Sequence, residues 1–127
     1  GIECLSRGVK KVIFIENYSR VLPILRENLL GLKLIDNHEI INTDIYDNKC
    51  VPNLKYKFDI IFLDPPYKDK NFNKILLMIK DFKILKTSGI IILHRHKNQK
   101  DIFPNSFKII EEKKYGISKI IFLSNSN

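Results

Sequence analysis

The sequence predicts an α/β fold in which amphipathic helices alternate with the strands of a doubly wound, mixed sheet. Short β-branched apolar runs alternate with stretches whose apolar residues recur at helical spacing. Strands buried on both faces of a parallel sheet are apolar in this continuous way, and parallel strands need crossover helices between them. Two further strand-like runs close the chain and add an antiparallel pair. Together these observations predict the mixed sheet.

The parallel strands are expected at residues 11–16, 39–42, 58–63 and 90–93, each followed by polar residues. The stretches 19–32 and 71–85 are predicted to be the crossover helices, with Gly31 and Gly89 in turns at helix ends. Runs 107–114 and 117–123, separated by Tyr115-Gly116, predict a hairpin. No repeat, glycine-rich linker or low-complexity tract divides the chain. We therefore expect one domain over residues 1–127.

Composition narrows the function classes. The 127 residues carry 22 Lys and Arg against 14 Asp and Glu, a net charge of +8. This favours a polyanionic partner such as nucleic acid. An AT-rich coding sequence would also give many lysines, and the chain has no alanine, so that explanation stays open. No apolar run reaches the roughly 18 residues that span a bilayer. Its only cysteines, Cys4 and Cys50, lie far apart, which fits a reducing cytoplasm.

The string Asp64-Pro65-Pro66-Tyr67, directly after the predicted strand 58–63, is the most informative motif. Each proline holds the preceding residue extended and offers no N–H, so the loop presents hydrogen-bond acceptors. One carboxylate and one carbonyl can accept both hydrogens of an exocyclic base amine while Tyr67 stacks on the base. The motif therefore predicts amine alkylation. The alternative is an ordinary Pro-Pro turn with an aromatic lid.

Ligands of open α/β sheets bind beyond the carboxyl ends of the strands, where Glu16 and Asp44 also stand. Glu16 suits a pair of ribose hydroxyls, because its two oxygens match two adjacent donors. Asp44 either accepts from an adenine amino group or caps a short helix at 45–50. Both alternatives stay open.

Two basic groups lie close to these motifs. Lys68 and Lys70 flank the proposed base pocket, where they either contact phosphate or belong to a solvated surface. His94 and His96 share one face of a strand. Three interpretations remain: a metal-binding pair without a visible third ligand, a cationic RNA-facing edge with Arg95 and Lys97, or a solvated strand end. No metal is expected.

In their order and spacing, these motifs resemble the RsmD-type 16S rRNA guanine-N2 methyltransferases, class I enzymes that use S-adenosylmethionine. The resemblance covers essentially the whole chain. Residues 1–8 resemble the family's helix after a glycine-rich loop, 12–16 the strand that ends on Glu16, 64–67 the catalytic motif, and 114–116 with the last strand the closing hairpin. The Asp-Pro-Pro-Tyr motif by itself is less specific, because adenine-N6 methyltransferases share it.

The resemblance implies a Rossmann-like mixed sheet of the class I methyltransferase type that lacks its first strand and glycine loop, both expected before Gly1. It implies that Asp64, Pro65, Pro66 and Tyr67 position the guanine amine. It also implies S-adenosylmethionine as cofactor, and 16S rRNA or the small ribosomal subunit as partner. Glu16, Asn17, Asp44 and Ile45 would bind the cofactor.

One departure concerns His94, which stands where relatives often carry an acidic residue. Two other functions are kept as alternatives. One is an adenine-N6 methyltransferase acting on DNA or RNA, and the other is an inactive, basic nucleic-acid-binding fragment.

Overall fold

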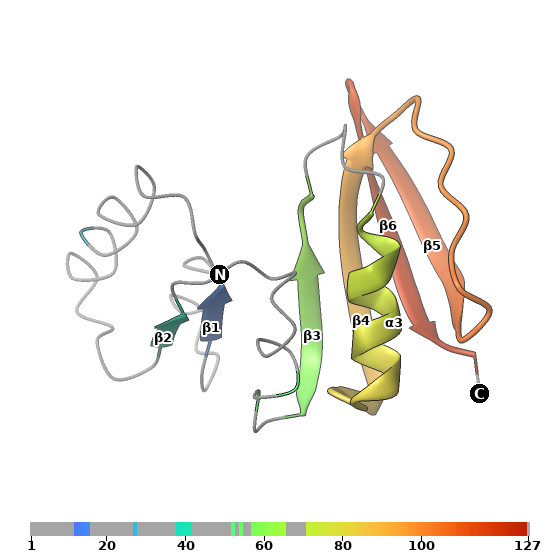
Figure 1. Cartoon of the computed structure of the whole chain (residues 1–127). Helices are drawn as coiled ribbons and strands as arrows, with labels where there is room; N and C mark the ends of the chain where they lie inside the picture. The colour runs from blue at the N-terminus through green and yellow to red at the C-terminus, as the bar shows by residue number, and fades with distance from the viewer. Residues whose placement is uncertain are drawn as a thin grey trace. The chain divides into compact units, whose positions relative to one another are not determined.

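A computed structural model describes residues 12–15, 27, 38–41, 52, 54, 57–65 and 71–126. The chain divides into two compact units, residues 1–50 and 51–127, and each is described by itself (Figure 1). In the first unit, β1 (Val12–Ile15) pairs in parallel with β2 (His38–Ile41), with Ile15 opposite Ile41. Both strands therefore end at the same edge of the pair. This confirms the two strands predicted for this part of the chain.

The second unit is built on a mixed four-stranded sheet (Figure 1). Its strands are β3 (Phe58–Leu63), β4 (Leu85–His96), β5 (Phe107–Tyr115) and β6 (Ser118–Asn125), in the order β3-β4-β6-β5. β3 runs parallel to β4, whereas β6 is antiparallel to both β4 and β5. The last strand, β6, thus lies between β4 and β5. The predicted mixed sheet and hairpin are confirmed.

The hairpin turn depends on Gly116. Tyr115 pairs with Ser118, so the connection has two central residues, and Gly116 takes a φ of +55°. Two-residue hairpins that begin with glycine form the primed turns whose twist matches that of the flanking strands. The sequence signal at 115–116 therefore has a direct structural cause.

Helix α3 (Asn73–Asp81) connects β3 to β4 and is shorter than the predicted 71–85. Lys83 adopts a left-handed φ of +51°. Its N–H donates to the Lys80 carbonyl at 3.2 Å, and the Ile84 N–H donates to the Ile79 carbonyl at 3.2 Å. These two bonds form a Schellman end. The longer prediction was wrong because Ile84 is buried after this turn, just before β4, and is not part of the helical face.

Gly89 was expected in a turn, and this prediction was wrong. It lies buried inside β4. The first residue of this strand, Leu85, pairs with Phe58 of β3. A Cβ atom at Gly89 would come within 2.5 Å of the Leu85 Cδ1 atom and 2.9 Å of the Lys86 carbonyl oxygen. The register of β4 with β3 shifts here, between the pairs Phe58–Leu85 and Ile60–Ile90. Glycine is therefore needed because the chain packs closely against itself at an irregularity inside the strand.

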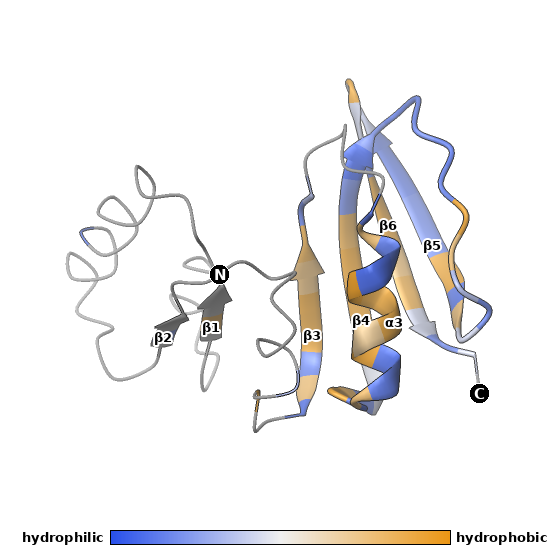
Figure 2. Ribbon diagram, viewed as in Figure 1, coloured by the Kyte–Doolittle hydropathy of each residue, from blue (hydrophilic) through white to orange (hydrophobic). Residues whose placement is uncertain are grey.

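The core lies between α3 and one face of the sheet. Residues of β4 alternate, and those on the buried face include Ile91, Leu93 and Arg95. The Phe72 ring, just before α3, lies 4.6 Å from the Arg95 guanidinium carbon, which identifies this face as the one beside the start of α3. Figure 2 shows hydrophobic residues along much of β4 and β6, whereas most of β5 is hydrophilic. No helix in the described part of the chain is long and apolar enough to cross a membrane.

Candidate active site at the carboxyl end of β3

The candidate site is centred on Asp64, the first residue after β3. The parallel register of β3 and β4 continues to the pair Leu63 and Leu93, so the next residues, Asp64 and His94, lie side by side. The Nδ1 atom of His94 is 3.0 Å from the Oδ1 atom of Asp64. An ionised carboxylate only accepts hydrogen bonds, so the imidazole nitrogen is the donor. This bond fixes one oxygen of the carboxylate at the sheet edge where parallel α/β folds bind ligands.

The two side chains of this pair remain accessible. The Asp64 side chain is 59% exposed and the His94 side chain 35% exposed. Ile60 and Phe62 alternate with Asp64 onto the same face of β3 and are 58% and 59% exposed. This is the face opposite α3. The carboxylate therefore stands at the end of a partly exposed apolar surface.

Of the predicted catalytic residues, the structure describes two. Asp64 lies at the strand end, as predicted, and Pro65 follows it, half-buried. Pro66, Tyr67, Lys68 and Lys70 lie outside the described residues, as do all four predicted cofactor ligands, Glu16, Asn17, Asp44 and Ile45. Glu16 directly follows β1, and Asp44 comes three residues after the end of β2. Their proposed roles stay predictions.

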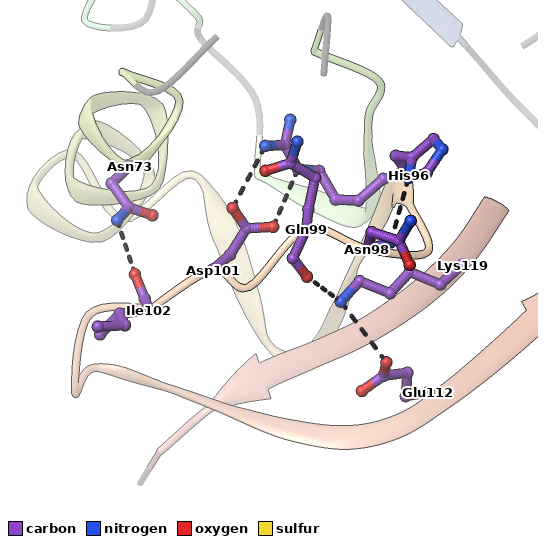
Figure 3. A network of polar contacts seen from close by, with 9 residues as sticks. Asn73, His96, Asn98, Gln99, Asp101, Ile102, Glu112 and Lys119 are labelled. Atoms are coloured by element: carbon purple, nitrogen blue, oxygen red, sulfur yellow. Dashed lines mark hydrogen bonds and ion pairs between the residues drawn. The ribbon is translucent and has the colours of Figure 1, made fainter. Parts of the chain in front are cut away.

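Arg95 does not contribute to a cationic edge. Its side chain is 1% exposed, and it forms two bonds to Asp101, from Nε at 3.0 Å and from Nη2 at 3.2 Å (Figure 3). A guanidinium that is paired in this way and stacked on Phe72 is a structural element of the core. The interpretation of this strand end as a cationic, RNA-facing edge is therefore wrong in including Arg95.

His94 and His96 do share a face of β4, because both alternate with the buried Arg95. Their partners differ. His94 contacts Asp64, whereas the Nδ1 atom of His96 accepts from the Asn98 N–H at 3.1 Å (Figure 3). Within the described ranges, no group of three or more His, Cys, Asp or Glu side chains could hold a metal ion.

A second group of polar contacts holds the loop between β4 and β5. The Lys119 ammonium donates to the Gln99 carbonyl and lies 3.8 Å from a Glu112 carboxylate oxygen (Figure 3). The Asn73 amide donates to the Ile102 carbonyl at 2.7 Å. These bonds tie the loop to β6 and to the first turn of α3. They support the end of β4 on which His94 stands.

The contact between His94 and Asp64 was not predicted. A signal for it was present in the sequence: each residue directly follows an apolar run assigned to a parallel strand, 58–63 and 90–93. Parallel strands end at a common edge, so the two residues could meet there. What the sequence did not show was that the two strands are neighbours in register.

Comparison with known proteins places the chain in a family. Residues 1–124 match the family model described as conserved hypothetical protein 95. The chain is 32% identical over 118 residues to ribosomal RNA small subunit methyltransferase D of Haemophilus influenzae. That match covers 92% of this chain and 61% of the relative, so the chain spans about six tenths of that protein's length.

Solved structures share the fold. A Haemophilus influenzae crystal structure, of a protein named as a methylase, superposes with a TM-score of 0.83 at 29% identity, covering 100% of this chain and 80% of that one. A conserved hypothetical protein of Streptococcus pyogenes superposes with a TM-score of 0.85 at 24% identity, covering 98% and 77%. These likenesses confirm the predicted fold of the class I methyltransferase type. The chain therefore belongs to the conserved hypothetical protein 95 family, which confirms the RsmD-type resemblance of its sequence.

Proposed function

We propose that the protein methylates the N2 amine of a guanine in small-subunit ribosomal RNA, with S-adenosylmethionine as the methyl donor. The single observation that supports this most is the Asp64 carboxylate, held at the carboxyl end of β3 and followed by Pro65-Pro66-Tyr67. The family and the similarity to a ribosomal RNA methyltransferase support the same activity.

In this proposal the chain mainly binds and orients the base. Asp64 accepts a hydrogen bond from the guanine amine, and a carbonyl of the Pro65-Pro66 segment accepts the second hydrogen. Tyr67 stacks on the base plane. As the new carbon–nitrogen bond forms, positive charge develops on N2, and the Asp64 carboxylate stabilises it. The amine then loses one proton to solvent.

In this proposal the chain also supplies the residues that hold the cofactor. β1 and β2 are parallel, so their carboxyl ends meet at one edge, and Glu16 and Asp44 follow those ends in the chain. Glu16 with Asn17 would hold the ribose hydroxyls, and Asp44 with the Ile45 backbone would meet the adenine. When bound, S-adenosylmethionine supplies a methyl group on a sulfonium sulfur that leaves as a neutral thioether.

Single-turnover methylation with Asp64 variants tests the proposal. The protein, at its natural length, would be mixed with small ribosomal subunits or 16S rRNA, and the product nucleoside identified by mass spectrometry. We expect methyl on guanine N2, and Asp64→Ala should lower the rate by at least about 100-fold with cofactor affinity within a few fold. Asp64→Asn keeps an acceptor and should retain more activity if geometry matters more than charge.

Three outcomes would contradict it. Undiminished transfer by Asp64→Ala would remove the catalytic role of this residue. Methyl on adenine N6 would favour the alternative that shares the Asp-Pro-Pro-Tyr motif. An absence of any transfer by the natural protein, together with retained RNA binding, would favour the non-enzymatic alternative, a basic nucleic-acid-binding protein.

A further inference from the structure

We propose that His94 is a positioning residue, which fixes the orientation of the Asp64 carboxylate through its Nδ1–H. The inference rests on the proposed function and assigns a role to a residue that the resemblance left without one. The observation is the 3.0 Å contact between His94 Nδ1 and Asp64 Oδ1.

Asp64 needs a support from outside its own strand. The pairing between β3 and β4 extends only to Leu63 and Leu93, so Asp64 is the first residue beyond the ladder. Its carboxylate can rotate about two side-chain bonds and is 59% exposed. A carboxylate that must aim one oxygen at an amine loses catalytic efficiency when this rotation is free.

His94 is well placed to give that support. β4 has a hydrogen-bonded strand on each side, β3 and β6, and His94 itself lies opposite Ile120 of β6. The buried neighbours Leu93 and Arg95 hold the backbone on either side of it. His94 is therefore still paired with β6, whereas Asp64 lies just beyond the end of its strand. A donor on a paired strand thus orients an acceptor beyond the ladder.

The bond also gives the two carboxylate oxygens of Asp64 different partners. Oδ1 receives the imidazole N–H, and Oδ2 then points in a fixed direction to accept from the guanine amine. In the neutral ring this requires the tautomer with hydrogen on Nδ1, which the carboxylate selects.

A set of four variants tests the role by kinetics. We expect His94→Ala to lower kcat for methylation by roughly 10- to 100-fold, the effect of a misplaced catalytic group, with little change in the KM for S-adenosylmethionine. His94→Asn, whose amide nitrogen can stand near the position of Nδ1, should recover part of the loss. His96→Ala is the control, since His96 lies on the same face of β4 and its Nδ1 atom accepts from the Asn98 N–H. It should leave kcat within about two-fold of the natural protein.

The fourth variant shows whether His94 acts through Asp64. In an Asp64→Ala background, adding His94→Ala should have no further effect, because the group that it orients is gone. An additional loss of 10-fold or more would overturn the inference. So would a His94→Ala rate equal to that of the natural protein when Asp64→Ala alone is inactive, and in that case the proposed function would stand.

A readout that needs no activity completes the test. Long-range proton–nitrogen NMR spectra of the imidazole rings should show hydrogen on Nδ1 of His94, and Asp64→Ala should shift these signals while His96 is unchanged. His94 signals that do not respond to Asp64→Ala would overturn the inference whatever the enzyme methylates. If the signals respond but no substrate is methylated, the contact stands and the proposed function fails.

Discussion

The buried ion pair of Arg95 and Asp101 is expected to have a large effect on the free energy of unfolding when either residue is replaced. Both charges have left water almost completely, with side chains 1% and 10% exposed. Such a pair is satisfied only while both members are present, because a lone buried charge keeps its desolvation cost and loses its attraction. The pair Lys86 and Asp59, at 3.2 Å, offers a contrast, since its side chains are 48% and 77% exposed.

A comparison of two equivalent substitutions tests this difference. Asp101→Asn should lower the free energy of unfolding by about 3–5 kcal/mol, as breaking a buried pair does. Asp59→Asn should lower it by about 0–1 kcal/mol, as for exposed pairs. Urea denaturation of both variants measures the two values. Equal losses would mean that Arg95 is stabilised by Phe72 and its surroundings and not by Asp101.

The position of Arg95 shows what could and could not be predicted for a single residue from the sequence. Its burial was implied by alternation, because Ile91, Leu93 and Arg95 have the same parity along β4. The neighbouring His94, His96 and Lys97 made the segment resemble a basic surface instead. The partner, Asp101, comes from a loop whose path back over the sheet has no sequence signal. Asp64, in contrast, was predicted correctly at its strand end.

At the scale of elements, β4 shows that a local turn signal can mark an irregularity inside a strand. Ser88-Gly89 resembles a turn, and although β4 spans Leu85–His96, its register with β3 shifts at this segment: Phe58 pairs with Leu85, whereas Ile60 pairs with Ile90. The irregularity brings the Leu85 side chain beside Gly89, while Leu85 itself pairs with Phe58. The hairpin of β5 and β6 was predicted well because its periodicity and its glycine turn agree.

Gly89→Ala tests the packing explanation. An added methyl group would meet the Leu85 side chain and the Lys86 carbonyl oxygen, and the backbone atom cannot move without distorting the strand. We expect a loss of about 1–3 kcal/mol in unfolding free energy, the usual cost of overpacking. Ser88→Ala, at the exposed neighbouring position, is the control and should change stability by about 0.5 kcal/mol or less. A neutral Gly89→Ala would show that the strand tolerates a side chain there.

The end of α3 permits the opposite kind of change. Lys83 has a left-handed backbone, which strains any residue with a Cβ atom. Lys83→Gly should relieve this strain and, after the greater freedom of glycine in the unfolded chain is subtracted, stabilise the protein by about 0.5–1 kcal/mol. Lys83→Ala keeps the strain and should be close to neutral. Thermal unfolding of the two variants distinguishes them, and equal effects would contradict the assigned cause.

At the scale of the whole molecule, the net charge of +8 predicts a salt-dependent affinity for RNA. If the protein acts on 16S rRNA, as proposed, binding of this RNA should weaken steadily as salt rises. If Lys68 and Lys70 contact phosphate, changing both to Gln should reduce the slope of log affinity against log salt by about 0.7 per lost contact. Lys86→Gln, which removes an exposed lysine at the start of β4, is the control for charge alone. Filter binding at several salt concentrations measures the slopes, and an unchanged slope in the double variant would place both lysines away from the RNA.

The order of the strands has a consequence for synthesis on the ribosome. β4 and β5 are synthesised before β6, but they have no hydrogen bonds to each other, because β6 lies between them in the sheet. Until β6 emerges, the surfaces that Ile121 and Leu123 will cover stay open, and these two residues are 2% and 0% exposed in the finished fold. The strands of the nascent sheet therefore cannot all pair in the order in which they are synthesised. A premature stop before residue 118 would leave two unpaired strand edges, the kind of surface that invites aggregation or capture by chaperones.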